Sequence, residues 1–287
     1  QHLNSPFGVC VRNGKIYIAD TDNHRIQIFS TDAEYLTTVG RQYMNLLDNQ
    51  HLYSPRGVSV DDDGRIFISD CNNHRVQVYA DDGTYLATLG IPGTPGTAQE
   101  QLYNPHHLSC YGTRVYIADT KNHRIQIFEY DPINNRFNHM DTIGISGASG
   151  MDEAHLNNPQ GVFVNDTYIF VGDTKNGRVM VYNHRYLVES VLSMFSVPKG
   201  IWASEHLYVS DLGAHCIKVL NQNFEEIDCI GTQGESGSTN NKFDSPTDVA
   251  VGPKGFIYVC DYKNHRIQIF TPYPEMKYYK TLGITRE

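Results

Sequence analysis

One ten-residue segment occurs six times along the chain, and this repetition constrains the fold more than any other feature. Four near-identical copies carry the pattern Asp-x-x-Asn-His-Arg and occupy residues 20–29, 70–79, 119–128 and 261–270. Two divergent copies, DTKNGRVMVY and DLGAHCIKVL, occupy residues 173–182 and 211–220. Such spacing is typical of architectures in which every copy builds one supersecondary unit. Residues common to all copies therefore indicate the scaffold, and residues that differ are better indicators of function.

Each copy contains four short segments with the period-two alternation of β-strands. In the first copy they are residues 8–11, 15–20, 24–29 and 33–40, and Asn13-Gly14 is a hairpin signal between the first two. This pattern predicts an all-β fold, a six-bladed β-propeller with four antiparallel strands per blade. We expect one domain over residues 1–287, with blades at about 1–40, 41–90, 91–144, 145–193, 194–231 and 232–287.

Composition narrows the classes of function. The chain has 23 Lys plus Arg against 32 Asp plus Glu, a formal charge of −9, which makes nucleic-acid binding the less favoured prediction. It contains no stretch of 18 apolar residues, so we expect no membrane insertion. It also opens without the basic and apolar regions of a signal peptide. The compartment stays open between a cytoplasmic domain of a larger protein and a secreted propeller.

A family resemblance follows from the repeat. The succession Pro-x-Gly-Val-x-Val, Tyr-Ile-Ala-Asp and Asn-His-Arg-Ile-Gln-Ile-Phe resembles the NHL-repeat family of six-bladed propellers. Gly177 and the segment 212–216 depart from that pattern. The resemblance implies the fold and, more loosely, a binding role, because one fold hosts many functions. Some NHL domains bind single-stranded RNA, which makes RNA the alternative partner.

The repeated polar residues favour a structural role. Five of the 13 histidines share one repeat position, and an aspartate ends the second strand of every copy. Symmetry spreads these residues around a circle, whereas zinc needs three or four ligands at one point. We expect the aspartates to cap turns or pair with the arginine five residues later. The sequence therefore predicts no metal site and no cofactor.

An enzyme is the third alternative. The family resembles the peptidyl-amidating lyases, whose zinc is held by three histidines, two of them directly after a blade-initial proline. Here only His106 follows such a proline, so we predict that the protein is not a metal-dependent lyase or hydrolase of this type. No HExxH motif, serine nucleophile elbow or phosphate-binding loop is present.

Two covalent features are predicted. Cys216 and Cys229 replace an Arg and Thr pair found at the same spacing in blades 1 and 2, and we expect them to face each other as a disulfide. The alternative is two small residues that fill the face of the blade. Asn165 begins the sequon Asn-Asp-Thr at a predicted turn, where a glycan would be exposed.

The residues that break the symmetry point to a partner site. The connector between blades 4 and 5 is short, and the single tryptophan lies nearby. Large aromatic residues and arginine are favoured in partner surfaces. We therefore predict a non-catalytic recognition propeller that binds a protein or peptide on the face carrying the inter-blade loops. The candidate site consists of the six post-proline residues with two aromatic neighbours: Phe7, Arg56, His106, Gln160, Lys199, Thr247, Trp202 and Tyr262.

Overall fold

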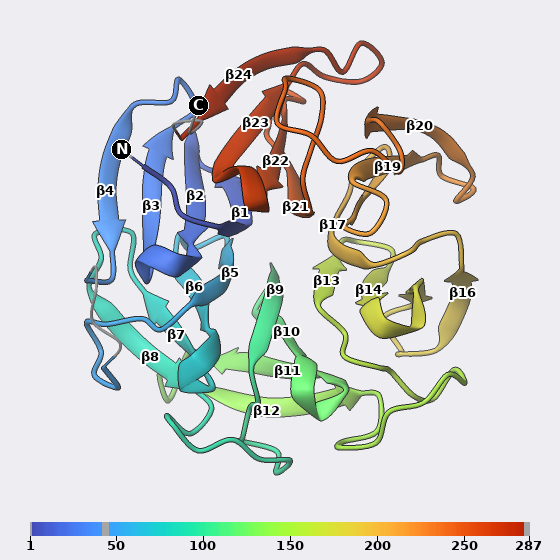
Figure 1. The fold of residues 1–287 in the computed structure, drawn as a ribbon. Coiled ribbons are helices and arrows are strands. Elements are labelled where there is room, and N and C mark those ends of the chain that lie inside the picture. The colour runs from blue at the N-terminus through green and yellow to red at the C-terminus, as the bar shows by residue number, and fades with distance from the viewer. Residues whose placement is uncertain (1, 42–45, 284–287) are drawn as a thin grey trace.

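The computed structural model describes residues 2–41 and 46–283. Within these residues it contains six four-stranded antiparallel sheets arranged around a central axis (Figure 1). This confirms the predicted all-β, six-bladed propeller. The helices of the described chain are short 3-10 turns. None of the described helices is long and apolar enough to cross a membrane.

Every sheet is built from consecutive strands, and the first strand of each lies innermost (Figure 1). The strands of the first three blades are β1 (Pro6–Arg12), β2 (Lys15–Asp20), β3 (Arg25–Ser30), β4 (Tyr35–Val39), β5 (Pro55–Val60), β6 (Ile66–Asp70), β7 (Arg75–Tyr79), β8 (Tyr85–Leu89), β9 (Pro105–Tyr111), β10 (Arg114–Asp119), β11 (Arg124–Asp131) and β12 (Arg136–Ile143). Those of the last three are β13 (Gly161–Val164), β14 (Ile169–Asp173), β15 (Arg178–Tyr182), β16 (Val188–Leu192), β17 (Pro198–Ala203), β18 (Leu207–Asp211), β19 (Cys216–Leu220), β20 (Glu226–Gly231), β21 (Pro246–Val251), β22 (Ile257–Asp261), β23 (Arg266–Phe270) and β24 (Tyr278–Leu282).

A 3-10 turn joins the second and third strands in five blades. These turns are η1 (Thr21–Asn23), η2 (Cys71–Asn73), η3 (Thr120–Asn122), η4 (Thr174–Asn176) and η5 (Tyr262–Asn264). They lie on the same side as the connectors between blades, and we call this side the loop-bearing face. The opposite side, which carries the turns within the other hairpins, is the hairpin face.

The core consists of apolar clusters between neighbouring blades. The alternating residues of β2 and β3 are buried on both faces of the sheet, because each blade packs against a neighbour on either side. Blades 6 and 1 share one such cluster, which contains Val9, Ile18, Cys260 and Ile267. Strands are not exchanged between these two blades, so the ring closes by packing and hydrogen bonds between β1 and β21.

Candidate binding site on the loop-bearing face

The repeated histidines connect each blade to the next. Each has left-handed backbone angles, as in His24 with φ of 56°, and its Nδ1 accepts a backbone N–H from the residue before the next blade-initial proline. His265 closes the ring in this way by accepting the N–H of Ser5 at 3.0 Å. This confirms a structural role for the histidine ring. Gly177 occupies the histidine position in blade 4 and has no imidazole to accept such a hydrogen bond. The short connector between blades 4 and 5 follows this blade.

The repeated aspartates and arginines hold the connectors from inside the blade. Asp119 accepts the Nε–H of Arg124 at 2.8 Å and the backbone N–H of Tyr103 at 2.6 Å. The remaining guanidinium nitrogens of Arg124 donate to backbone carbonyls of the connector, including those of Thr97 and Ala98. The same Arg–Asp pairing occurs in four other blades. The recurrent motif is therefore scaffold, as predicted.

Four of the post-proline residues converge near the axis. The ring of Phe7 meets the rings of His106 and Tyr262 edge-on, with centroids 5.5 and 5.9 Å away. The guanidinium carbon of Arg56 and the Nζ of Lys199 each lie 4.9 Å from the centroid of the same ring. We call Phe7, Arg56, His106, Lys199 and Tyr262 the axial cluster.

The axial cluster carries positive charge that no carboxylate neutralises within it. Among the residues that the structure describes, neither Arg56 nor Lys199 forms an ion pair, and Arg56 donates instead to Nε2 of His106 at 2.7 Å. Burial, with the neighbouring Arg56, lowers the pKa of Lys199 to about 7. Burial and the two nearby cations hold the pKa of His106 well below its usual range, so His106 is neutral. The cluster therefore suits a ligand that brings negative charge.

Of the other predicted site residues, Gln160 and Thr247 adjoin the axial cluster through His106 and Phe7, whereas Trp202 lies apart from it. Thr247 is fully buried and donates its hydroxyl to the carbonyl of Phe7 at 2.8 Å, so it joins blades 6 and 1. The backbone carbonyl of Gln160 accepts the N–H of His107. Trp202 does not join the axial cluster, because it lies near the end of β17 where the strand reaches the hairpin face. There its ring packs at a tilt against the ring of Phe163.

The predicted disulfide between Cys216 and Cys229 is wrong, and both thiols are free. The register of β19 and β20 pairs Cys216 with Gly231 and Cys229 with Lys218. The two cysteines are thus diagonal neighbours, which lie about 7–8 Å apart in antiparallel sheets and beyond disulfide reach. In blade 1, likewise, Thr38 pairs with Gln27 and not with Arg25. The spacing of the two cysteines thus predicted correctly that they share one face of the blade, but not which residues they pair with across the strands.

The described structure contains six free cysteines, which gives a simple test. A sample unfolded without reductant should react with six equivalents of a thiol-specific dye. A count of four would show that a disulfide forms in the purified protein, and peptide mapping would then identify the pair.

Asn165 lies at the turn after β13, as predicted. Its side-chain oxygen accepts the backbone N–H groups of Thr167 and Tyr168 at 3.0 and 2.9 Å. Glycosylation of this residue stays a prediction. As for metals, the described residues include no group of three or more His, Cys, Asp or Glu side chains placed to hold a metal ion.

Sequence reasoning missed two features. Three exposed lysines, Lys121, Lys175 and Lys263, occupy the same position of their 3-10 turns on the loop-bearing face. In addition, the Pro-x-Gly pattern of the inner strand is broken in blades 3 and 6, where His107 and Asp248 replace the glycine. Alignment of the six copies by their prolines would have revealed both signals.

Comparison with known proteins agrees with this geometry. The family model of the NHL repeat matches residues 3–29, 52–79 and 243–270. A solved streptogramin B lyase aligns with 100% of this chain and 85% of its own, with a TM-score of 0.67 at 10% identity. Virginiamycin B lyase from Staphylococcus aureus aligns with 100% of this chain and 89% of its own, with a TM-score of 0.63 at 12% identity. A chain of a nidogen/laminin complex aligns with 95% of both chains, with a TM-score of 0.64 at 13% identity.

At these identities the solved structures show the fold alone. The fold and the site define a β-propeller with an inter-blade loop face and a cationic, aromatic centre. Within its six-bladed β-propeller, the chain carries segments that match the NHL repeat in blades 1, 2 and 6.

Proposed function

We propose that the protein is a non-catalytic recognition propeller that binds an acidic segment of a protein partner on its loop-bearing face. The observation that carries this proposal is the axial cluster, where Arg56 and Lys199 flank Phe7 without a carboxylate partner among the described residues. A guanidinium beside an aromatic ring is a typical anchor for a carboxylate together with an apolar neighbour. An Asp or Glu side chain next to an apolar residue would satisfy both.

The surroundings of the axial cluster support the same chemistry. Lys121 and Lys175 are exposed on the turns of neighbouring blades and form no ion pair within the described chain. The protein as a whole carries a formal charge of −9, so positive charge near the axis of this face is a local departure from the average. Such a field steers a negatively charged partner toward the cluster.

Single-stranded RNA is the second candidate, because the same lysines would attract phosphates. Tyr103, which is 39% exposed and stacks edge-on against His74, offers a ring on which a base can stack. We favour a protein partner because only two cations, Arg56 and Lys199, lie close to the axis in the described structure, and both contact the apolar ring of Phe7. The two partners differ in salt dependence, since counterion release makes RNA binding fall steeply with added salt.

Selection from random peptides displayed on phage tests the proposal without knowledge of the natural partner. We expect the enriched peptides to contain Asp or Glu beside an apolar residue and to compete with one another for one site. Enrichment of neutral or basic peptides would overturn the proposal. Tight, salt-sensitive binding of oligouridylate together with failure to enrich any peptide would favour RNA instead.

Binding of a selected acidic peptide should depend on pH through Lys199. Because the pKa of this amine is lowered to about 7, it is charged below that pH and loses its charge above it. Affinity should therefore fall about tenfold as the pH rises from about 6 to about 8. The Lys199→Arg variant stays charged throughout and should bind with a nearly flat profile. A wild-type profile as flat as that of the variant, measured by calorimetry, would contradict this role of Lys199.

A further inference from the structure

A second site lies at the other end of the axis. A cavity of about 530 Å³ opens on the hairpin face, within the size range of small-molecule sites. Its wall is of mixed polarity, and the apolar part includes Val9, Val58, Val60, Phe163, Ile201 and Trp202. The innermost strands of all six blades contribute residues to this wall, so the cavity is formed by the closed ring of blades.

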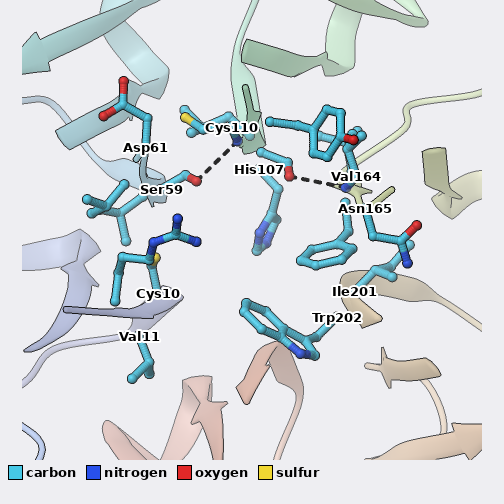
Figure 2. Close-up of a pocket in the computed structure, with 18 of the residues that line it drawn as sticks. Cys10, Val11, Ser59, Asp61, His107, Cys110, Val164, Asn165, Ile201 and Trp202 are labelled. Atoms are coloured by element: carbon cyan, nitrogen blue, oxygen red, sulfur yellow. Dashed lines mark hydrogen bonds between the residues drawn. The ribbon is translucent and has the colours of Figure 1, made fainter. Parts of the chain in front are cut away.

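Two residues that line this cavity have a buried polar atom without a hydrogen-bond partner in the described structure, Nε2 of His107 and the indole nitrogen of Trp202. His107 is 6% exposed, and its ring points toward the middle of the cavity (Figure 2). Within the described residues its Nε2 accepts and donates no hydrogen bond. A buried polar group without a partner is destabilising, so a ligand that supplies the partner gains affinity.

The state of His107 defines what that partner must be. Burial lowers the pKa of His107 to about 3, so the ring is neutral. Its Nδ1 lies 3.5 Å from Oδ2 of Asp248, an oxygen that already accepts the backbone N–H of Val9 at 2.8 Å. Burial raises the pKa of Asp248 well above its usual range, yet both of its oxygens accept backbone N–H groups, Oδ2 from Val9 and Oδ1 from Val249. The oxygen beside Nδ1 thus acts as an acceptor, which favours the ring proton on Nδ1 and the lone pair on Nε2. The cavity therefore presents a hydrogen-bond acceptor at its inner end.

Several other polar groups of the cavity already have partners. The Oγ atoms of Ser59 and Ser109 accept the backbone N–H groups of Cys110 and Val164 at 3.3 and 3.2 Å, as the dashed lines of Figure 2 show. Burial raises the pKa of Cys10 to about 12, so this thiol is uncharged.

Two of the aspartates at the mouth of the cavity are paired with arginines. Arg12 pairs with Asp62, and Asp61 accepts the Nε–H of Arg65 at 2.6 Å. Asp166 also lines the cavity; within the described residues it accepts the Tyr111 hydroxyl at 3.1 Å and forms no ion pair. The mouth therefore keeps negative charge, which favours a neutral ligand over an anion.

Two aromatic rings favour a flat ligand. Trp202 and Phe163 lie with centroids 4.9 Å apart and their planes inclined at 47°, and both are partly buried in the cavity wall. Figure 2 shows the ring of Trp202 reaching toward the cavity opposite His107. Offset and edge-on contacts with such rings stabilise a bound aromatic ring.

The replacement of glycine at the second position after the blade-initial proline, in blades 3 and 6, supports a dedicated function of this cavity. In blades 1, 2, 4 and 5 the residue is Gly8, Gly57, Gly161 and Gly200, and a Cβ there would overlap atoms of the next blade. Blades 3 and 6 instead carry His107 and Asp248, whose side chains meet near the axis. The two departures from glycine thus create one polar pair at the inner end of the cavity.

We propose that this cavity binds a small, neutral aromatic molecule that carries one hydrogen-bond donor, such as a phenol. Its ring lies against Trp202 and Phe163, and its hydroxyl donates to Nε2 of His107. The ring of His107 lies 5.7 Å from the ring of Phe7, so the inner end of this cavity adjoins the axial cluster of the loop-bearing face.

The single tryptophan makes the test direct, because Trp202 is both the wall of the cavity and the only tryptophan in the chain. Titration with p-cresol should change the Trp202 fluorescence to saturation. p-Xylene has nearly the same shape but a methyl group in place of the hydroxyl. It should bind at least about tenfold more weakly, since it leaves Nε2 without a donor. Absence of saturable binding by p-cresol, or equal affinity for both compounds, would overturn the proposal.

Two variants test whether His107 is the residue that distinguishes p-cresol from p-xylene. His107→Phe should bind both compounds with similar affinity, while His155→Phe, a change on a connector of the loop-bearing face, should keep the preference for p-cresol. If His107→Phe does not fold, the comparison of the two compounds on the wild-type protein still decides. Preserved preference in folded His107→Phe would show that the donor binds elsewhere and would overturn the assignment.

Discussion

Replacement of Arg124 by methionine should lower the free energy of unfolding by about 3–5 kcal/mol, because it leaves a buried carboxylate without its charge partner. Arg124 is 2% exposed, and Asp119 beside it is fully buried. Burial already raises the pKa of Asp119, and the guanidinium is among the groups that oppose this rise. The same substitution removes the donors that hold the connector carbonyls of Ala98 and Gln101 at 2.8 Å.

Urea unfolding followed by circular dichroism measures this loss. Arg136→Met is the matched control, because Arg136 is exposed on the outer strand β12 and should cost little. A loss of less than about 1 kcal/mol for Arg124→Met would show that the Arg–Asp pair is not what holds the blade and its connector.

The paired substitution Arg56→Gln with Lys199→Gln should weaken binding of a selected acidic peptide by about 100-fold. Each charge-assisted hydrogen bond to a carboxylate contributes about 1.5–3 kcal/mol, and tenfold in affinity corresponds to about 1.4 kcal/mol. The fold should persist, since neither side chain forms an ion pair within the described residues. Calorimetry gives the affinity, and the unfolding midpoint verifies the fold.

A control with the same change in net charge separates a site from a general field. Lys254→Gln with Lys277→Gln removes two exposed lysines from the hairpin face and should change affinity by less than about threefold. Equal losses for the two double variants would mean that overall charge, and not the axial cluster, attracts the peptide.

The fold was predictable because its determinants are local and repeated. Strand alternation, the Asn13-Gly14 turn and six copies of one motif all favour the same propeller. The role of the repeat Asp and Arg was also predictable, since the two residues flank one tight turn. Sequence could place Phe7, Arg56 and Lys199 at equivalent positions of different blades.

The contacts across the axis were beyond sequence reasoning. Equivalence by symmetry does not show that Arg56 and Lys199 reach the same phenylalanine ring, or that Trp202 lies at the opposite end of its strand. The disulfide prediction failed for a related reason. Constant spacing in a hairpin fixes which face residues share, but register is set by the turn, and the turn shifted Cys229 to a position opposite Lys218.

Hydrogen–deuterium exchange with and without a selected acidic peptide tests most directly that the loop-bearing face is the binding surface. We predict that the bound peptide slows exchange at the entries of the inner strands near Arg56, His106 and Lys199 and at the turn of Tyr262. Exchange in the turns of the hairpin face should not change. Protection confined to the hairpin face, with none around the axial cluster, would contradict the account.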